Sequence, residues 1–295
     1  TSSEADVERS RLEAARELDW HISRGFQLDS VQIETQWERI LVPRRMHFLG
    51  IGLAMQVAMG GPSAPTTQTT QPIVTGTTVI GIKYAGGVML AADTLASYGS
   101  LARYKDVRRL QRVGESTIIG ASGEISDYQT IMEMLSSMDQ SDINEDDGYK
   151  KSPSEYFNYL RAILYTRRGK GNPLWNQLLV AGYQNDSPFL GYVDMIGTAY
   201  EENFIATGFG AYLAIPLIRE RWHAEMDEGE ARSLMEDCLR VMFYRDCRAL
   251  NRIQIAKATS EGTLVSEPYQ LETEWETANF DVRHSSAVTL DGSSW

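Results

Sequence analysis

Residues 76–93 read GTTVIGIKYAGGVMLAAD, two short apolar runs joined by a pair of glycines. The runs extend from Thr78 to Lys83 and from Val88 to Ala92, with Gly86-Gly87 between them. A glycine pair flanked by short apolar runs favours two antiparallel strands joined by a tight hairpin. A third run, Thr117 to Ala121, has the same character. The sequence therefore predicts a layer of strands at this point.

Two helices are predicted after these strands. Ser126 and Gln129 have the spacing of a capping box, and apolar residues follow at helical period as far as Met138. Residues 152–155, Ser-Pro-Ser-Glu, combine a serine N-cap, a proline at the first helical position and a glutamate at the third. We expect the second helix to begin at Pro153.

The second half of the pattern repeats this order. Strands are predicted over 174–183 and 189–195, helices over 211–222 and about 230–250, and a last strand over 253–258. Strands, two helices, strands, two helices and a strand indicate an α/β (α+β) fold. We expect a four-layer αββα sandwich, in which two sheets face each other and a helical layer covers each outer side.

Composition changes on both sides of this region. The apolar run 48–59 is shorter than the roughly 20 residues that cross a bilayer, and secretion is the minor alternative for it. Linker composition follows, rich in Gly, Pro, Thr and Gln over 60–71. We predict a leader or propeptide-like appendage with its linker over 1–68, the domain over 69–265 and a tail over 266–295.

Charge and cysteine content exclude several functions. Against 40 Asp and Glu there are 28 Lys and Arg, a net charge of −12, so we expect neither nucleic acid nor a membrane as partner. Cys238 and Cys247 would lie about 180° apart on the predicted helix and cannot form a disulfide, which fits a reducing compartment. The four histidines show no ligand spacing, so no metal and no cofactor is expected.

Three short motifs are candidates for chemistry. Residues 120–123, Gly-Ala-Ser-Gly, lack the spacing of a nucleophile elbow and favour a tight turn from strand to helix. Residues 208–210, Gly-Phe-Gly, are a lone G-x-G and favour a helix entry. The third is Gly76-Thr77-Thr78 at the start of a strand, with Asp93 at the end of the next strand.

The third motif belongs to a wider resemblance. Residues 76–78, 91–93 (Ala-Ala-Asp) and 244–246 (Tyr-Arg-Asp) together resemble the proteasome β subunits, which have an N-terminal-nucleophile hydrolase fold. The resemblance extends from about Thr69 to Phe280, and residues 97–103, 172–176 and 206–211 are similar to the signatures of one β type. It implies a role in protein degradation, α and β proteasome subunits as partners in a stacked-ring complex, and a location in the cytoplasm and nucleus.

The resemblance also assigns a site. In active members an N-terminal threonine hydroxyl attacks the peptide carbonyl, its own α-amine serves as base, and an Asp and a Lys tune the proton transfer. By position Thr77 is the nucleophile and Asp93 the buried acid, while the lysine falls on Arg109. A guanidinium remains charged, so Arg109 is expected to pair with Asp93 without relaying a proton.

Further positions depart from the active pattern. Asp246 remains, but one supporting serine falls on Ala249 and the other on Thr207. General acid–base catalysis contributes roughly 10²- to 10⁴-fold, so losing the relay and a positioning hydroxyl predicts a silent site. We expect a non-catalytic structural β subunit, with no active catalytic residue among these six positions.

Two alternatives remain open. One is an active threonine peptidase in which Arg109 is tolerated or Lys83 or Lys105 replaces the missing lysine, and the other is a stand-alone binding protein with the same fold. A silent site cannot cleave its own leader. We therefore expect the Gly76-Thr77 bond to stay intact and a neighbouring subunit to trim the chain between about Ser63 and Thr70.

The tail is a candidate interface. Seven acidic residues stand against one arginine over 261–295, with aromatic residues among them. Trp and Tyr anchors surrounded by charge are typical of interfaces. The resemblance implies that the tail reaches the opposite ring, so Trp275 and Phe280 are expected to anchor the chain to a partner ring and help join two half-particles. Deleting the chain from Pro268 onward is expected to leave the domain folded.

Overall fold

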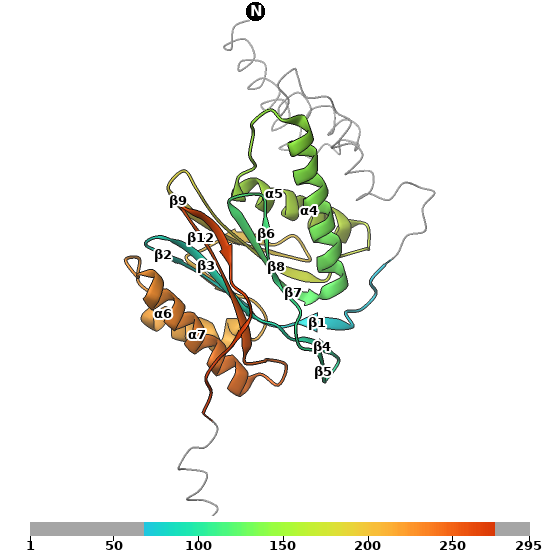
Figure 1. Cartoon of the computed structure of the whole chain (residues 1–295). Coiled ribbons are helices and arrows are strands. Elements are labelled where there is room, and N and C mark those ends of the chain that lie inside the picture. Colours follow the sequence, from blue (N-terminus) through green and yellow to red (C-terminus); the bar gives the residue numbers. More distant parts are fainter. Residues whose placement is uncertain (1–67, 275–295) are drawn as a thin grey trace, which may run out of the picture. The chain divides into compact units, whose positions relative to one another are not determined.

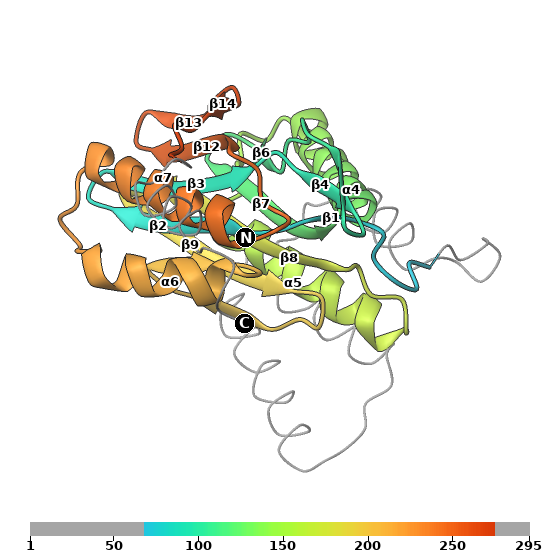
Figure 2. The ribbon, with the colours of Figure 1, turned by 90° about the horizontal axis from the view of Figure 1, so that it is seen from below.

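Two antiparallel sheets lie face to face, and a pair of helices covers the outer side of each (Figure 1, Figure 2). The computed structural model describes residues 68–274. The four layers confirm the predicted αββα sandwich. The leader over 1–67 and the last residues, 275–295, lie outside the described part of the chain.

The larger sheet has eight strands, and the smaller has six. In the order of the larger sheet they are β10 (Ala199–Glu201), β9 (Ser187–Asp194), β8 (Asn176–Gln184), β7 (Thr117–Glu124), β1 (Val74–Gly76), β4 (Ala96–Tyr98) and β5 (Leu101–Tyr104), with β6 (Leu110–Val113) also on β7. The smaller sheet runs β11 (Phe204–Ala206), β2 (Val79–Tyr84), β3 (Gly87–Asp93), β12 (Arg252–Thr259) and β13 (Gly262–Val265), with β14 (Tyr269–Gln270) also on β12. The strands predicted from apolar runs are β2, β3, β7, β8, β9 and β12, whereas the shorter strands had no periodicity that could reveal them.

Helices α4 (Ile125–Glu145) and α5 (Pro153–Gly169) cover the larger sheet, and α6 (Gly210–Arg221) and α7 (Glu228–Arg245) cover the smaller one (Figure 2). The predicted capping box of α5 is confirmed, since Ser152 accepts from the Glu155 amide and the Glu155 side chain accepts from the Ser152 amide. The capping box predicted at Ser126 is wrong. That residue lies inside α4, and its hydroxyl donates to Glu124 at the end of β7.

The core is layered in the same way. One apolar cluster lies between the sheets, with Val79, Leu90, Ile118 and Leu179 among its members. A second joins the larger sheet to α4 and α5, and a third joins the smaller sheet to α6 and α7. Each fully buried Leu, Ile or Val contributes about 1.5–3 kcal/mol relative to exposure, so these clusters hold the sheets and helices in fixed positions.

Two hairpins turn as the sequence predicts. Asn185 and Asp186 have φ angles of 52° and 55°, the left-handed pair that a tight turn between β8 and β9 requires. In the β2–β3 hairpin a Cβ at Gly87 would lie 2.2 Å from the carbonyl oxygen of Ala258. Glycine is needed there because the neighbouring strand β12 approaches so closely.

Helix α7 is shorter than predicted. It ends at Arg245, and Asp246 caps it with extended backbone angles, so residues 246–250 form a loop instead of the last helical turn. Cys247 therefore lies beyond the helix and is exposed, whereas Cys238 is buried within α7, and both are free thiols. The loop matters because it lies over the end of β3, where the candidate site is found.

The tail boundary also differs from the prediction. β14 pairs with β12, and Leu271 is buried in the cluster under α6 and α7. The Tyr269 hydroxyl donates to Glu236 on α7 at 2.6 Å. The chain beyond residue 265 is thus part of the fold, and a deletion from Pro268 removes core contacts, contrary to the expectation. The predicted anchors Trp275 and Phe280 lie outside the described residues.

Candidate functional site

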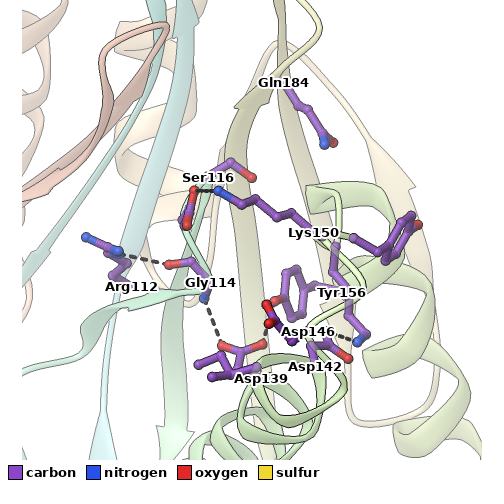
Figure 3. Close-up of a pocket in the computed structure, with 14 residues that line it drawn as sticks. Arg112, Gly114, Ser116, Asp139, Asp142, Asp146, Lys150, Tyr156 and Gln184 are labelled. Atoms are coloured by element: carbon purple, nitrogen blue, oxygen red, sulfur yellow. Dashed lines mark hydrogen bonds and ion pairs between the residues drawn. The ribbon is translucent and has the colours of Figure 1, made fainter.

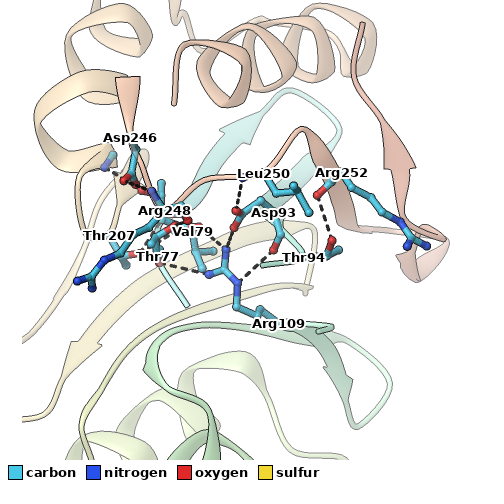
Figure 4. A network of polar contacts seen from close by, with 12 residues as sticks. Thr77, Val79, Asp93, Thr94, Arg109, Thr207, Asp246, Arg248, Leu250 and Arg252 are labelled. Carbon is cyan, nitrogen blue, oxygen red and sulfur yellow. Dashed lines mark hydrogen bonds and ion pairs between the residues drawn. The ribbon is translucent and has the colours of Figure 1, made fainter. Parts of the chain in front are cut away.

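The six predicted site positions come from six places in the chain. Thr77 joins β1 to β2, Asp93 ends β3 and Arg109 precedes β6. The others are Thr207 between β11 and α6, Asp246 at the end of α7, and Ala249 in the loop before β12. The fold brings the first five together beside the loop 246–250, in which Ala249 lies (Figure 4).

Asp93 is the acidic centre of the site. It is 4% exposed, and its Oδ1 accepts a hydrogen bond from the Arg109 guanidinium in an ion pair. Its Oδ2 accepts from the Leu250 amide at 2.8 Å. Burial raises the pKa of the Asp93 carboxyl, while the neighbouring guanidinium and amide act in the opposite direction.

Arg109 is buried with no exposed side-chain surface. Its five N–H groups all donate to acceptors: the carbonyls of Thr77, Thr78, Asp93 and Ala121 at 3.0–3.2 Å and the Asp93 carboxylate (Figure 4). A guanidinium has five donors and no acceptor, so this set leaves none for the Thr77 hydroxyl. Arg109 therefore connects the starts of β2 and β6, the end of β3 and the middle of β7.

Gly76 lies against the same arginine. A Cβ built on Gly76 would lie 2.4 Å from Arg109 Cδ. The backbone holds one end of the Arg109 side chain, and the hydrogen bonds of its guanidinium hold the other. The side chain therefore cannot move away from such a Cβ. The residue before Thr77 is consequently restricted to glycine by the packing of Arg109.

β1 fills the space on the amino side of Thr77. It pairs with β4 through Thr75 and Ser97 and with β7 through Gly76 and Gly123, antiparallel on both sides. Gly76 is the last residue of β1 and directly precedes Thr77. The edges of β4 and β7 that face each other across β1 are therefore both occupied by it.

Buried side chains hold the segment that leads into β1. Glu124 Oε2 accepts from the amides of Ile73 at 2.5 Å and Val74 at 3.1 Å. The hydroxyl of Thr69 donates to Asp127 at 2.8 Å, and its carbonyl accepts from the Trp175 indole at 2.7 Å. Sequence reasoning did not single out Glu124, Asp127 or this contact of Trp175, although 172–176 was one of the motifs noted.

The Thr77 hydroxyl has a single weak bond among the described residues, a donation to the Arg248 carbonyl at 3.5 Å. That carbonyl is not a base. Thr207, which the resemblance matches to a supporting serine, accepts with its hydroxyl from the Val79 amide at 2.8 Å. It connects the start of α6 to β2.

Asp246 has one unsatisfied oxygen. The residue is buried, and its Oδ1 accepts from the Arg248 amide at 2.9 Å. Oδ2 is buried and has no hydrogen-bond partner among the described residues. Ala249, three residues on, supplies only its backbone amide to the Asp246 carbonyl. An unpaired buried carboxylate oxygen is costly and marks a position where a donor is missing.

The other two motifs have structural roles. Ser122 lies in β7 and donates to the Gln177 carbonyl at 3.2 Å. The turn predicted at 120–123 is wrong, because these residues pair with β8 as part of β7, and α4 begins at Ile125 directly after the strand. Gly210 is the first residue of α6, the predicted helix entry, and its amide donates to the Thr78 hydroxyl. Neither motif presents a nucleophile.

A separate pocket of about 640 Å³ lies between the β6–β7 turn and the α4–α5 loop (Figure 3). Asp139 accepts there from Tyr156 and from the Gly114 amide, while Lys150 and Lys151 are each paired with a carboxylate. Burial and the Asp139 carboxylate raise the pKa of Tyr156, so the phenol remains protonated. These groups join the turn to the helices.

Within residues 68–274, no cluster of three or more His, Cys, Asp or Glu side chains is arranged to hold a metal ion. In the same residues no helix is both long and apolar enough to span a bilayer.

Comparison with known proteins identifies relatives over most of the chain. The family model of proteasome subunits matches residues 73–258. Proteasome subunit beta type-4 of Arabidopsis thaliana is 46% identical over 213 residues, which is 72% of this chain and 87% of the plant protein. Beta type-4 of Xenopus laevis is 46% identical over 222 residues, 74% of this chain and 90% of the frog protein. Proteasome subunit beta type-7 of Saccharomyces cerevisiae is 43% identical over 216 residues, 68% and 79% of the two chains.

Proposed function

The chain belongs to the proteasome subunit family, and we propose that it is a structural β subunit of the proteasome core particle with no peptidase activity of its own. Its relatives carry the names beta type-4 and beta type-7. Its partners are then the other α and β subunits of a stacked-ring complex, in which it builds a β ring and helps to join two half-particles.

The observation that carries this proposal is the hydrogen bonding of the Arg109 guanidinium. All five of its donors are engaged by fixed acceptors, four of them backbone carbonyls. A guanidinium also keeps its proton at any physiological pH. At the position where the resemblance places a proton-relaying lysine, this chain has a group that stabilises the fold and moves no proton.

Two further features support the same conclusion. The strand before Thr77, β1, is paired on both sides, which favours retention of the segment that blocks the Thr77 nitrogen. The nearest bond of the Thr77 hydroxyl is to a carbonyl oxygen. Among the described residues the Thr77 hydroxyl therefore has no base as a partner, and the relay position holds a guanidinium.

The test uses native particles. Cells express the full chain with a C-terminal tag, the particle is purified, and a covalent inhibitor that reacts with N-terminal threonines is added before intact-mass analysis of every subunit. We expect this chain to elute with the large assembly and to remain unlabelled, while active subunits of the same particle are labelled and serve as the positive control.

Each alternative has its own outcome. A label on Thr77 would establish an active threonine peptidase. Elution at the mass of a monomer or a small oligomer would establish a stand-alone binding protein.

We also propose a location in the cytoplasm and nucleus. Cys238 and Cys247 are both free thiols, which suits a reducing compartment. Fluorescence microscopy of the tagged chain tests this, and signal confined to a secretory compartment would contradict it.

A further inference from the structure

β5 is the last strand of the larger sheet, and among residues 68–274 it pairs only with β4 (Figure 1). Its four residues, Leu101–Tyr104, are all exposed. The outer edge of such a strand presents unpaired backbone N–H and C=O groups, which can pair with an extended segment of another chain.

The exposed side chains here form an ordered cluster. Leu101 is 57% exposed, Tyr98 49% and Tyr104 43%. The Arg103 guanidinium lies 5.9 Å from the ring centroid of Tyr98 and 5.5 Å from that of Tyr104, within cation–π range of both. Two rings from two strands thus hold one arginine on the surface. We call Tyr98, Leu101, Arg103 and Tyr104 the β5 surface.

The charge of this region is opposite to that of the chain. Nearby charged side chains are paired, Arg108 with Glu267 and Asp106 with Arg252. Arg103 and Lys105 have no carboxylate partner among the described residues. Within a chain of net charge −12, two exposed cations beside an open strand edge are complementary to an acidic segment.

We propose that the β5 surface receives an extended, carboxylate-bearing segment of a neighbouring subunit, an inference that rests on the proposed function as a complex subunit. The segment pairs with the free edge of β5, and its carboxylate binds the N–H edge of Arg103. Stacking has already restricted the guanidinium, so less side-chain entropy is lost on binding. Tyr and Arg are also the residues enriched at the energetic centres of interfaces.

Protective design of an edge strand is the competing explanation. Short edges with cations and a bulge discourage pairing, and β5 is short, with an irregular register to β4. In such a protected edge the charged side chains extend into solvent. Here the arginine is instead stacked between two exposed aromatic rings, an arrangement that leaves apolar surface and a bidentate donor available to a partner.

The first experiment compares charge reversals in the full chain. Arg103→Glu is matched with Arg161→Glu, an exposed arginine on α5, and each variant replaces the native copy in cells. We expect the fraction of chain in the large assembly to fall about tenfold for Arg103→Glu relative to Arg161→Glu. Thermal unfolding of both purified chains checks that folding is unchanged. Equal incorporation of the two variants would overturn the proposal.

The second experiment identifies the partner segment. A photo-crosslinking amino acid replaces Leu101 in the wild-type background, and crosslinked peptides from the assembled particle are sequenced. We expect an acidic segment of a neighbouring subunit, and a lysine in place of its carboxylate should restore incorporation of Arg103→Glu. A segment without carboxylates, a crosslink to residues 1–67 or 275–295 of the same chain, or no rescue would overturn the proposal.

The proposed function and this inference would be overturned by different results. A wild-type chain that never enters a large particle would overturn the proposed function together with this inference. A chain that enters normally, but without dependence on Arg103, would overturn only the inference.

Discussion

Arg109 is the residue at which this site departs furthest from an active threonine peptidase. Its charge is balanced by Asp93, and its N–H groups tie together strands of both sheets. A lysine at this position has three donors in place of five and lacks the planar fork that reaches opposite carbonyls. The structure thus gives this arginine a structural role, and under the proposed function it stands in place of a proton relay.

Replacing Arg109 by lysine tests this role. We expect Arg109→Lys to lower the free energy of unfolding by about 2–4 kcal/mol, because buried carbonyls lose their donors. We expect no gain of peptidase activity, since the Thr77 nitrogen stays an amide and Ala249 lacks a hydroxyl. Denaturant unfolding of the full chain and inhibitor labelling of the particle measure the two effects.

The control lies next along the chain. Arg108→Lys changes an exposed pair with Glu267 and should leave unfolding unchanged. Covalent labelling of Thr77 in Arg109→Lys would show that the arginine alone silences the site.

Gly76 supplies a second test at this scale. Gly76→Ala places a methyl group 2.4 Å from Arg109 Cδ, and we expect it to cost about 1–3 kcal/mol in stability. Gly169, at the end of α5, has open space where its Cβ would lie. Gly169→Ala should therefore be neutral or stabilise by about 0.5–1 kcal/mol. Equal thermal midpoints for the two variants would contradict the packing described here.

At the scale of elements, β1 gives the segment before Thr77 a structural role. It is a structural strand between β4 and β7, and the β4–β5 hairpin joins the larger sheet through it. Removing the chain up to Gly76 would separate that hairpin from β7. Retention of the segment is therefore built into the sheet.

Because the fold holds residues 69–76 in place, the position at which the leader is cleaved can be predicted. We expect the mature chain to begin at or before Thr69, because Asp127 and Trp175 hold that residue, and after about Ser63. Intact-mass analysis of the subunit from native particles locates the end. A mature chain beginning at Thr77 would contradict both this prediction and the proposed function.

Glu124 holds this segment through two backbone amides. Glu124→Ala should leave the Ile73 and Val74 amides without their acceptor and increase proteolytic cleavage between residues 69 and 76. Glu133→Ala, an exposed glutamate on α4, is the matched control. Limited proteolysis with peptide mapping compares them, and identical cleavage rates would show that Glu124 does not hold the segment.

At the scale of the whole molecule, the tail divides into two parts. Residues up to Leu271 complete the smaller sheet and its core, and the Glu274 amide donates to the Tyr244 hydroxyl at 2.8 Å. The aromatic residues proposed as interface anchors follow directly. Folding therefore depends on the first stretch of the tail, and the proposed role in assembly belongs to the second.

Two truncations separate these stretches. Deleting 275–295 should leave the thermal midpoint unchanged but slow the joining of two half-particles, if Trp275 and Phe280 anchor the partner ring. Deleting 268–295 should also lower the midpoint, because β14 and the buried Leu271 are lost. Native gels of half and full particles measure joining, and normal yields of full particle from the first truncation would exclude the anchoring role.

Sequence alone determined the features that depend on near neighbours. Apolar runs and turn residues indicated the longer strands, the Ser152 cap indicated the start of α5, and short motifs placed Thr77, Asp93 and Arg109 in a family. Periodicity and capping act over a few residues, so they are readable without a structure. Three-residue strands such as β1 carry too little pattern to be recognised.

Only the tertiary structure decided how the site is used. The bonds of Arg109 to Asp93 span 16 residues, and the bond of Trp175 to Thr69 spans 106. Such contacts form when sheets and helices close over a common core, and no local pattern specifies which donor meets which acceptor. The five occupied donors of Arg109, the pairing of β1 and the cluster on β5 therefore became visible only in the folded chain, because each is made by residues that the fold brings together.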